Sequence, residues 1–217
     1  MVFPPAQDSE PETGLTFTDI LFGIVIGALF MRLANANGLS EVVQLQLVVG
    51  AVVVLGSWIG FRRSLSRSTY ELKFFNLPLA RFVIDQLMVL LYFRMAILTP
   101  ADPKVHVDAG GLAHDTLVTL IYVFLLYAAW DVLGLWMARA RQNPWLPQAA
   151  RKYPNITAGW PGLLITLSFL VMFGLLFALI PERNLDEPTA VNALIAMAFL
   201  LVMYRFVKEA RTSWRLP

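Results

Sequence analysis

The sequence predicts an all-α polytopic membrane protein, a six-transmembrane-helix bundle with both termini in the cytoplasm. Of its 217 residues, 58% are hydrophobic and only 15% are charged, which is too apolar for an ordinary soluble domain. Apolar stretches of about 18 or more residues are typical of membrane-spanning helices. We identify six such stretches, and they leave no room for a separate soluble catalytic domain. The predicted helices are 17–36, 42–61, 76–98, 115–139, 161–180 and 188–207.

The first predicted helix, 17–36, carries Asp19 near its start and no further charge before Arg32. A carboxylate inside an apolar span is costly unless it faces protein or water, so Asp19 is a candidate functional residue. Gly23 and Gly27 are four residues apart, a spacing that lets another helix approach closely. Simple packing is one explanation of this pair, and it predicts that the first helix is an inner element rather than a lipid-facing one.

The second predicted helix follows a short loop near Asn35–Gly38, so the first two helices should form a tight antiparallel pair. Its Gly56-Ser57-Trp58 segment is not a nucleophile elbow, because Leu55 stands where that motif needs glycine. No other catalytic signature occurs, and the chain has no Cys. We therefore expect a protein that is not an enzyme and that holds no cofactor or metal.

Charged residues also lie inside the third and fourth predicted helices. Arg81 and Asp85 are four residues apart on one helix face, and Asp131 follows Trp130. At about 1.5 Å per residue, Asp19, Arg81 and Asp131 should all fall in the cytoplasmic third of the membrane. They could form a polar vestibule or a proton relay. Alternatively, Arg81 neutralises one or two of the acids and holds the helices together, since charges within membranes pair with one another.

The predicted outer loop, 99–114, contains both histidines of the chain. Histidine and carboxylate side chains can bind zinc, but the spacing here matches no metal motif. We expect a solvated loop without a metal site. The residues concerned are His106, Asp108, His114 and Asp115.

Basic residues predict the orientation in the membrane. Three segments fall on one side if six helices cross in turn, and each holds four Lys or Arg residues. The positive-inside rule places that side, and both termini, in the cytoplasm. We accordingly divide the chain into an acidic tail at 1–16, a membrane domain at 17–208 and a basic tail at 209–217. The twelve basic residues are Arg62, Arg63, Arg67 and Lys73, then Arg139, Arg141, Arg151 and Lys152, then Arg205, Lys208, Arg211 and Arg215.

The first helix opens with Phe17, Thr18 and Asp19, followed by a run rich in Ile and Leu. This opening resembles helix one of the transmembrane protein 175 family, the endolysosomal-type potassium channels and their bacterial relatives, which begins with F-S-D. Trp58 and Asn76 extend the resemblance more faintly, and about a quarter of the chain carries it. The residues that continue the hydrophobic pattern of helix one are Phe22, Ile24, Ile26 and Leu29.

The sequence departs from that family at several positions. Thr18 replaces the serine of the motif but keeps the hydroxyl, and Ile20 stands where bacterial members often have glycine. The histidine usually found just after the tryptophan is absent, and Arg62 and Arg63 are nearby instead.

The resemblance implies a tetramer in which helix one of each subunit lines a central pore. The constriction in the family is an Ile or Leu one to two turns after F-S-D, which matches Ile24, with Gly27 or Ala28 a turn later. Four such side chains can close a pore by excluding water. Phe17 and Asp19 would then be structural, with Asp19 held through Arg81 or Trp58.

Our leading hypothesis is an oligomeric cation channel, permeable to potassium, in a bacterial plasma membrane. Its expected partners are the lipid bilayer, monovalent cations and further copies of the chain, with no nucleic acid. Two alternatives remain open. One is a non-catalytic membrane anchor or accessory subunit of a larger membrane complex, and the other is a proton-coupled carrier that uses Asp85 and Asp131.

Overall fold

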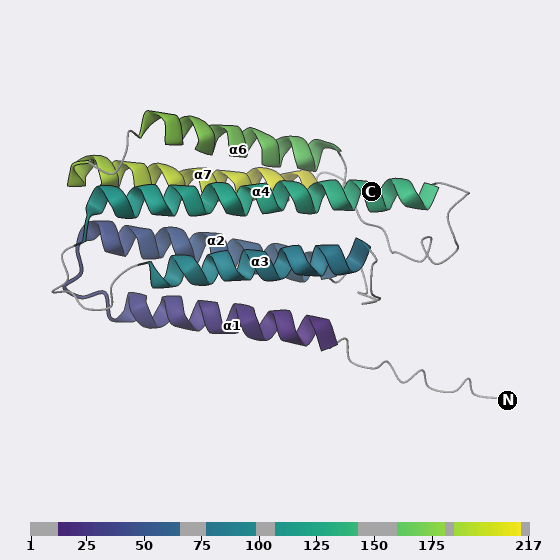
Figure 1. The fold of residues 1–217 in the computed structure, drawn as a ribbon, viewed down its shortest axis with the longest axis horizontal. Helices are drawn as coiled ribbons and strands as arrows, with labels where there is room; N and C mark the ends of the chain where they lie inside the picture. Colours follow the sequence, from purple (N-terminus) through teal and green to yellow (C-terminus); the bar gives the residue numbers. More distant parts are fainter. Residues whose placement is uncertain (1–12, 66–76, 99–106, 143–159, 181–184, 214–217) are drawn as a thin grey trace.

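The computed structural model describes residues 13–65, 77–98, 107–142, 160–180 and 185–213, and this part of the chain forms six α-helices. Successive helices alternate in direction, so α1 begins and α7 ends at the same end of the bundle, which we call the terminal end (Figure 1). The predicted all-α class is therefore confirmed. The helices are α1 (Thr13–Ala34), α2 (Glu41–Leu65), α3 (Leu77–Ile97), α4 (Ala109–Gln142), α6 (Trp160–Leu179) and α7 (Glu187–Ser213).

Two of these helices lie at the edges of the bundle. Helix α1 packs against α2 and α3, whereas α6 packs against α4 and α7 (Figure 1). The middle of the bundle is formed by α2, α3, α4 and α7. Within one chain, the expectation that the first helix is an inner element is therefore wrong.

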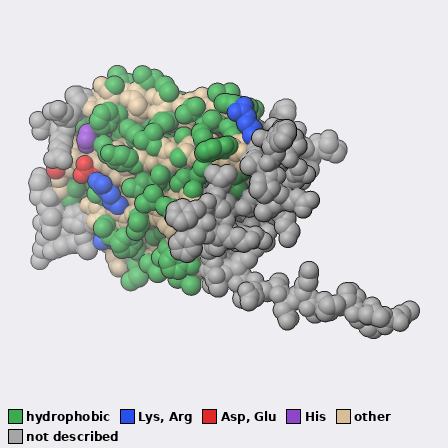
Figure 2. Space-filling model, turned by 45° about the vertical axis from the view of Figure 1, so that its right-hand side comes forward, with side chains coloured by type: hydrophobic (Ala, Val, Ile, Leu, Met, Phe, Trp, Pro, Cys, Tyr) green, Lys and Arg blue, Asp and Glu red, His purple; other side chains and the backbone are tan. Residues whose placement is uncertain are grey.

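Five helices are long and apolar enough to cross a membrane, namely α1, α2, α4, α6 and α7. Figure 2 shows one face on which hydrophobic side chains cover the surface between charged side chains near both ends. Helix α4 has 34 residues, about 51 Å at 1.5 Å per residue, and exceeds the roughly 30 Å hydrocarbon core. It extends past its neighbours at the terminal end (Figure 1).

Helix α3 is not among the five, because every 18-residue window in it contains Arg81, Asp85 and Arg94. The first two of these side chains are buried, at 2% and 3% exposure. The side chains that α3 exposes are largely apolar, including Val83, Leu87, Leu90 and Phe93, with Arg94 in the last turn. Two of the three charges that set α3 apart from the other helices are thus buried inside the bundle, and only Arg94 lies on its exposed surface.

The loop between α1 and α2 is as short as predicted. Gly38 has a φ of 92°, a left-handed conformation that glycine adopts without strain. The amide of Asn35 donates to the carbonyl of Met31 at 3.2 Å, and Gln44 Nε2 donates to the carbonyl of Leu39 at 3.0 Å. These bonds satisfy backbone groups at the turn and bring α2 back along α1.

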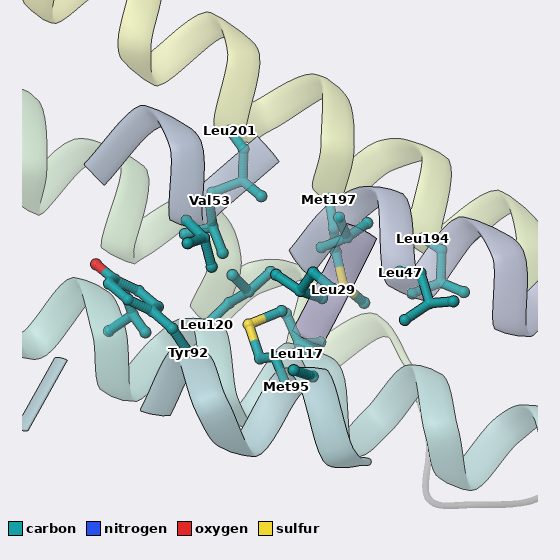
Figure 3. Packing of buried hydrophobic residues seen from close by; sticks show 14 of the residues in the cluster. Leu29, Leu47, Val53, Tyr92, Met95, Leu117, Leu120, Leu194, Met197 and Leu201 are labelled. Atoms are coloured by element: carbon teal, nitrogen blue, oxygen red, sulfur yellow. The ribbon is translucent and has the colours of Figure 1, made fainter. Parts of the chain in front are cut away.

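The core between the middle helices and α1 is apolar over much of its length. Figure 3 shows side chains of α2, α3, α4 and α7 packed together with Leu29 of α1. Gln46 is an exception, because its Nε2 donates at 2.8 Å to the carbonyl of Met95 in the last turn of α3. The fully buried residues in this region include Leu29, Leu47, Tyr92, Met95, Leu117, Leu120, Leu194 and Met197.

Candidate functional site: a polar cluster inside the bundle

Two basic residues of α7 lie in the interior near the terminal end. Arg205 and Lys208 are eight and five residues before Ser213, the last residue of the helix. At 1.5 Å per residue, they are about 12 Å and 8 Å from the helix end. Ionisable groups at such depth in a membrane helix face the protein interior or water, and they mark candidate functional sites.

Hydroxyl groups from three other helices surround Arg205. Its Nη2 donates to Ser57 Oγ of α2 at 2.9 Å and to the Tyr127 hydroxyl of α4 at 3.0 Å. The Tyr92 hydroxyl of α3 donates to Ser57 Oγ at 2.7 Å and lies 2.9 Å from the Tyr127 hydroxyl. Ser57 and Tyr127 also bond to each other, and Ser57 donates to the carbonyl of Val53 at 2.6 Å. This Arg205 cluster joins α2, α3, α4 and α7.

Two glycines of α2 make room for the guanidinium group. A Cβ atom at Gly56 would lie 2.7 Å from Arg205 Nε, and one at Gly60 would lie 2.8 Å from Arg205 Nη1. Real Cβ atoms do not approach other heavy atoms so closely. Because Gly56, Ser57 and Gly60 lie on one face of α2, the helix provides a notch into which Arg205 fits.

A second cluster joins α7 to α4 and α6. Lys208 Nζ donates to Tyr204 at 2.6 Å and to Asp131 Oδ2 and Thr166 Oγ1 at 3.3 Å each. Thr166 Oγ1 in turn donates to Asp131 Oδ2 at 2.6 Å. The Asp131 side chain is 8% exposed and that of Lys208 is 28% exposed, so this is a largely buried ion pair. We call these four residues the Lys208 cluster.

Aromatic rings connect the two clusters. Tyr127 and Tyr204 stack with ring centroids 5.8 Å apart and an interplanar angle of 13°. Arg205 lies 5.5 Å from both ring centroids, and Lys208 lies 5.8 Å and 5.1 Å from the centroids of Tyr127 and Tyr204. Electron-rich ring faces stabilise cations by electrostatic attraction. The two clusters therefore form one polar core of two cations, one carboxylate and five hydroxyls.

The structure buries all three predicted intramembrane charges. Arg81 lies 3.6 Å from the centre of the Trp130 ring, and Asp85 and Asp131 are 3% and 6% exposed. The cation that the structure places beside Asp131 is Lys208 of α7. This joins α4 to α7, a connection that the sequence analysis did not predict.

Near the start of α1, Asp19 pairs with Arg62 of α2, with 3.3 Å between Oδ2 and Nη1. Arg62 also lies 6.0 Å from the centre of the Trp58 ring. Thr18 is buried and accepts a hydrogen bond of 2.9 Å from Gln86 of α3. The F-T-D segment thus fastens α1 to its two neighbouring helices, and Phe17 is half exposed.

The predicted constriction residue, Ile24, is 55% exposed on the outer side of α1. Gly27 is also exposed, and Ala28 is partly buried against the core. A Cβ atom at Gly23 or Gly27 would meet nothing within 4 Å. The glycine pair therefore has no packing partner in the described part of this chain. Exposed positions recur at helical spacing as Phe17, Ile20, Gly23, Ile24, Gly27, Phe30 and Met31, which we call the α1 stripe.

His114 does not lie in a loop as predicted, because α4 already begins at Ala109. Asp108 precedes that helix, where a carboxylate interacts favourably with the helix dipole. The His114 ring lies 5.3 Å from that of Phe177, and its Nδ1 lies 3.7 Å from Asp115 Oδ1. No group that could hold a metal occurs in the described part of the chain, and His106 lies outside it.

From the sequence, Arg205 and Lys208 contributed only to the predicted topology, although Arg205 falls within the last predicted helix, 188–207. Two signals could have identified them. Tyr204, Arg205 and Lys208 share a helical face, and Gly56 and Gly60 form a second small-residue pair on α2. Neither signal specifies which helix the cations face.

The chain matches no protein-family model, no curated protein and no solved structure.

Proposed function

We propose that this chain is one subunit of an oligomeric cation channel, permeable to potassium, whose pore is lined by α1 from each of four copies. The observation that carries the proposal is the α1 stripe. It lies on an edge helix, it is apolar, and nothing else in the described part of the chain packs on its two glycines. A face of this kind is free to meet the same face of other copies around a symmetry axis.

Ile24 lies near the middle of α1, eleven residues after Thr13. A ring of isoleucines at that depth closes a pore by excluding water and needs no charged ring. Asp19, the acid closest to the stripe on α1, is engaged by Arg62. Its role in this proposal is to hold α1 against α2 rather than to coordinate ions.

The proposed topology has six crossings, with α3 included and both termini in the cytoplasm. Helix α3 has 21 residues, enough for about 30 Å at 1.5 Å per residue. Its buried Arg81 and Asp85 contact protein rather than lipid, so its charges do not oppose insertion beside the other helices.

Ion flux into liposomes tests the proposal. Ile24→Asn would place several amides around the pore axis, so potassium flux should rise and discrimination against sodium should fall. Ile195→Asn is the matched control, because Ile195 is a similarly exposed isoleucine (49%) on α7. Equal effects of the two variants on ion flux would show that α1 does not line the pore. If neither the wild-type protein nor Ile24→Asn conducts, the accessory-subunit hypothesis is favoured.

A proton-coupled carrier is the second candidate, and the Lys208 cluster favours it. Asp131 is a buried carboxylate that pairs with Lys208 and accepts a hydrogen bond from Thr166. Ionisable residues buried within membrane helices in this way often belong to proton pathways. Proton-driven uptake should then be lost in Asp131→Asn and kept in Asp19→Asn. A channel of the proposed kind would instead conduct passively in both variants.

A further inference from the structure

The corner where α4 ends and α6 begins presents an exposed arginine and two exposed tryptophans. Arg139 of α4 lies 5.4 Å from the centre of the Trp160 ring, the first residue of α6. Trp160 is 54% exposed and Trp136 is 62% exposed. Arg139 is exposed, and no hydrogen bond or ion pair joins its guanidinium to another residue in the described part of the chain.

Two apolar surfaces end at this corner. On α4, exposed side chains follow one another at helical spacing as Tyr122, Leu125, Val132, Trp136 and finally Arg139. On α6, Leu164, Leu167, Val171 and Leu175 continue from Trp160 in the same manner. Since α4 and α6 pack together and run in opposite directions, both surfaces reach the terminal end at the Arg139–Trp160 contact (Figure 1).

The order of these residues matches the layers of a phospholipid leaflet. Aliphatic side chains suit the acyl chains, tryptophan rings suit the interface, and a guanidinium binds a phosphodiester through paired N–H donors. The Trp160 ring lies within cation–π distance of the guanidinium, whose planar fork of N–H donors a lysine could not reproduce. We propose that Arg139, Trp136 and Trp160 form a binding site for the headgroup of an anionic phospholipid.

Charge selects an anionic headgroup over a zwitterionic one. The acid on this part of α4 is Asp131, and Lys208 already engages it. The described part of α6 holds no acid, so the two helices that form this corner offer no further carboxylate there to the ammonium group of a zwitterionic lipid. The adjoining apolar surface also distinguishes a lipid from free phosphate, because acyl chains gain affinity from each methylene that they bury.

The test uses purified full-length protein in nanodiscs of phosphatidylcholine, into which phosphatidylglycerol is titrated. The thermal unfolding midpoint should rise as phosphatidylglycerol is added. Inorganic phosphate should not raise the midpoint, and it should not reduce the rise that phosphatidylglycerol causes. Arg139→Gln should lose most of this rise, and Trp160→Leu should need several-fold more lipid for the same rise. Each variant is compared with its own midpoint in pure phosphatidylcholine.

Arg62→Gln is the matched control. Arg62 is 57% exposed, lies near a tryptophan at the same end of the bundle, and is already paired with Asp19. Its loss should leave the response to phosphatidylglycerol unchanged. An equal response in Arg139→Gln and wild type, or an equal loss in Arg62→Gln, would overturn the site. If inorganic phosphate competed with phosphatidylglycerol, the ligand would be a free anion rather than a lipid, and this result would also overturn the proposed site.

Discussion

Lys208 and Asp131 are 77 residues apart in the sequence and form a salt bridge of 3.3 Å inside the bundle. Each also bonds to Thr166 of α6, so three helices meet at one ion pair. Removing one member of a buried ion pair leaves an uncompensated charge, which costs more than the pair itself contributes. A single and a double substitution should therefore change the free energy of unfolding by different amounts, and the difference shows how strongly the pair is buried.

Lys208→Met should destabilise the protein by roughly 3–5 kcal/mol, because Asp131 would remain buried without its cation. The double variant Lys208→Met/Asp131→Leu should recover part of that loss. Arg62→Met provides the comparison, since the Arg62–Asp19 pair is more exposed and such pairs contribute about 0–1 kcal/mol. The free energy of unfolding of the two single variants and the double variant is measured in detergent and compared with that of the wild-type protein. A loss for Lys208→Met no larger than that for Arg62→Met would show that water reaches the pair.

Gly56→Ala should destabilise the protein by roughly 1–3 kcal/mol, the usual cost of overpacking. Gly60→Ala should cost less, because the nearest atom there is Nη1 at the end of the Arg205 side chain. The added methyl group would displace Arg205 from its bonds to Ser57 and Tyr127. Gly23→Ala is the control and should be neutral or slightly stabilising in the detergent-solubilised monomer, because nothing lies near that position. Combining Gly56→Ala with Arg205→Ala should cost less than the sum of the two changes.

Thr166→Val should weaken the attachment of α6. Thr166 carries the hydrogen bonds that join α6 side chains to other helices in the described part of the chain. Interhelical bonds of this kind in membranes contribute about 0.6 kcal/mol on average and up to about 1.7 kcal/mol. Ser168→Ala should have no effect, because Ser168 is exposed and bonds within its own helix. Thermal unfolding of both variants, with limited proteolysis near α6, checks the difference.

Arg81→Ala should destabilise the protein more than Arg94→Ala, although both residues belong to α3. Arg81 is 2% exposed and stacks on Trp130, whereas Arg94 is exposed in the last turn. Arg81→Lys should recover only part of the loss, since an ammonium group cannot reproduce the stacking of a planar guanidinium. Similar unfolding midpoints for the two alanine variants would mean that the Arg81 charge reaches water.

The absence of Cys from the sequence permits a direct topology test. Asn37→Cys lies in the loop between α1 and α2, and Leu98→Cys follows the last residue of α3. Both should react with a membrane-impermeant maleimide added from outside intact cells, whereas a cysteine added after Pro217 should react only after lysis. Labelling of Leu98→Cys only after lysis would show that α3 does not cross the membrane.

The helical class and the approximate helix positions were predictable from the sequence, because long apolar runs can satisfy their backbone hydrogen bonds in a membrane only within helices. The sequence also identified Arg81, Asp85 and Asp131 as buried charges and located the tight turn at Gly38. These properties follow from local composition and spacing, which each segment carries on its own.

Which helices pack against one another became known only from the three-dimensional structure. The sequence could not show that Lys208 is the cation beside Asp131, or that Arg205 fits against Gly56 and Gly60 of a helix almost 150 residues earlier. It also could not show that Ile24 and the two glycines of α1 face away from the chain. Helical periodicity indicates which residues share a face, but the neighbour of that face depends on how all six helices pack.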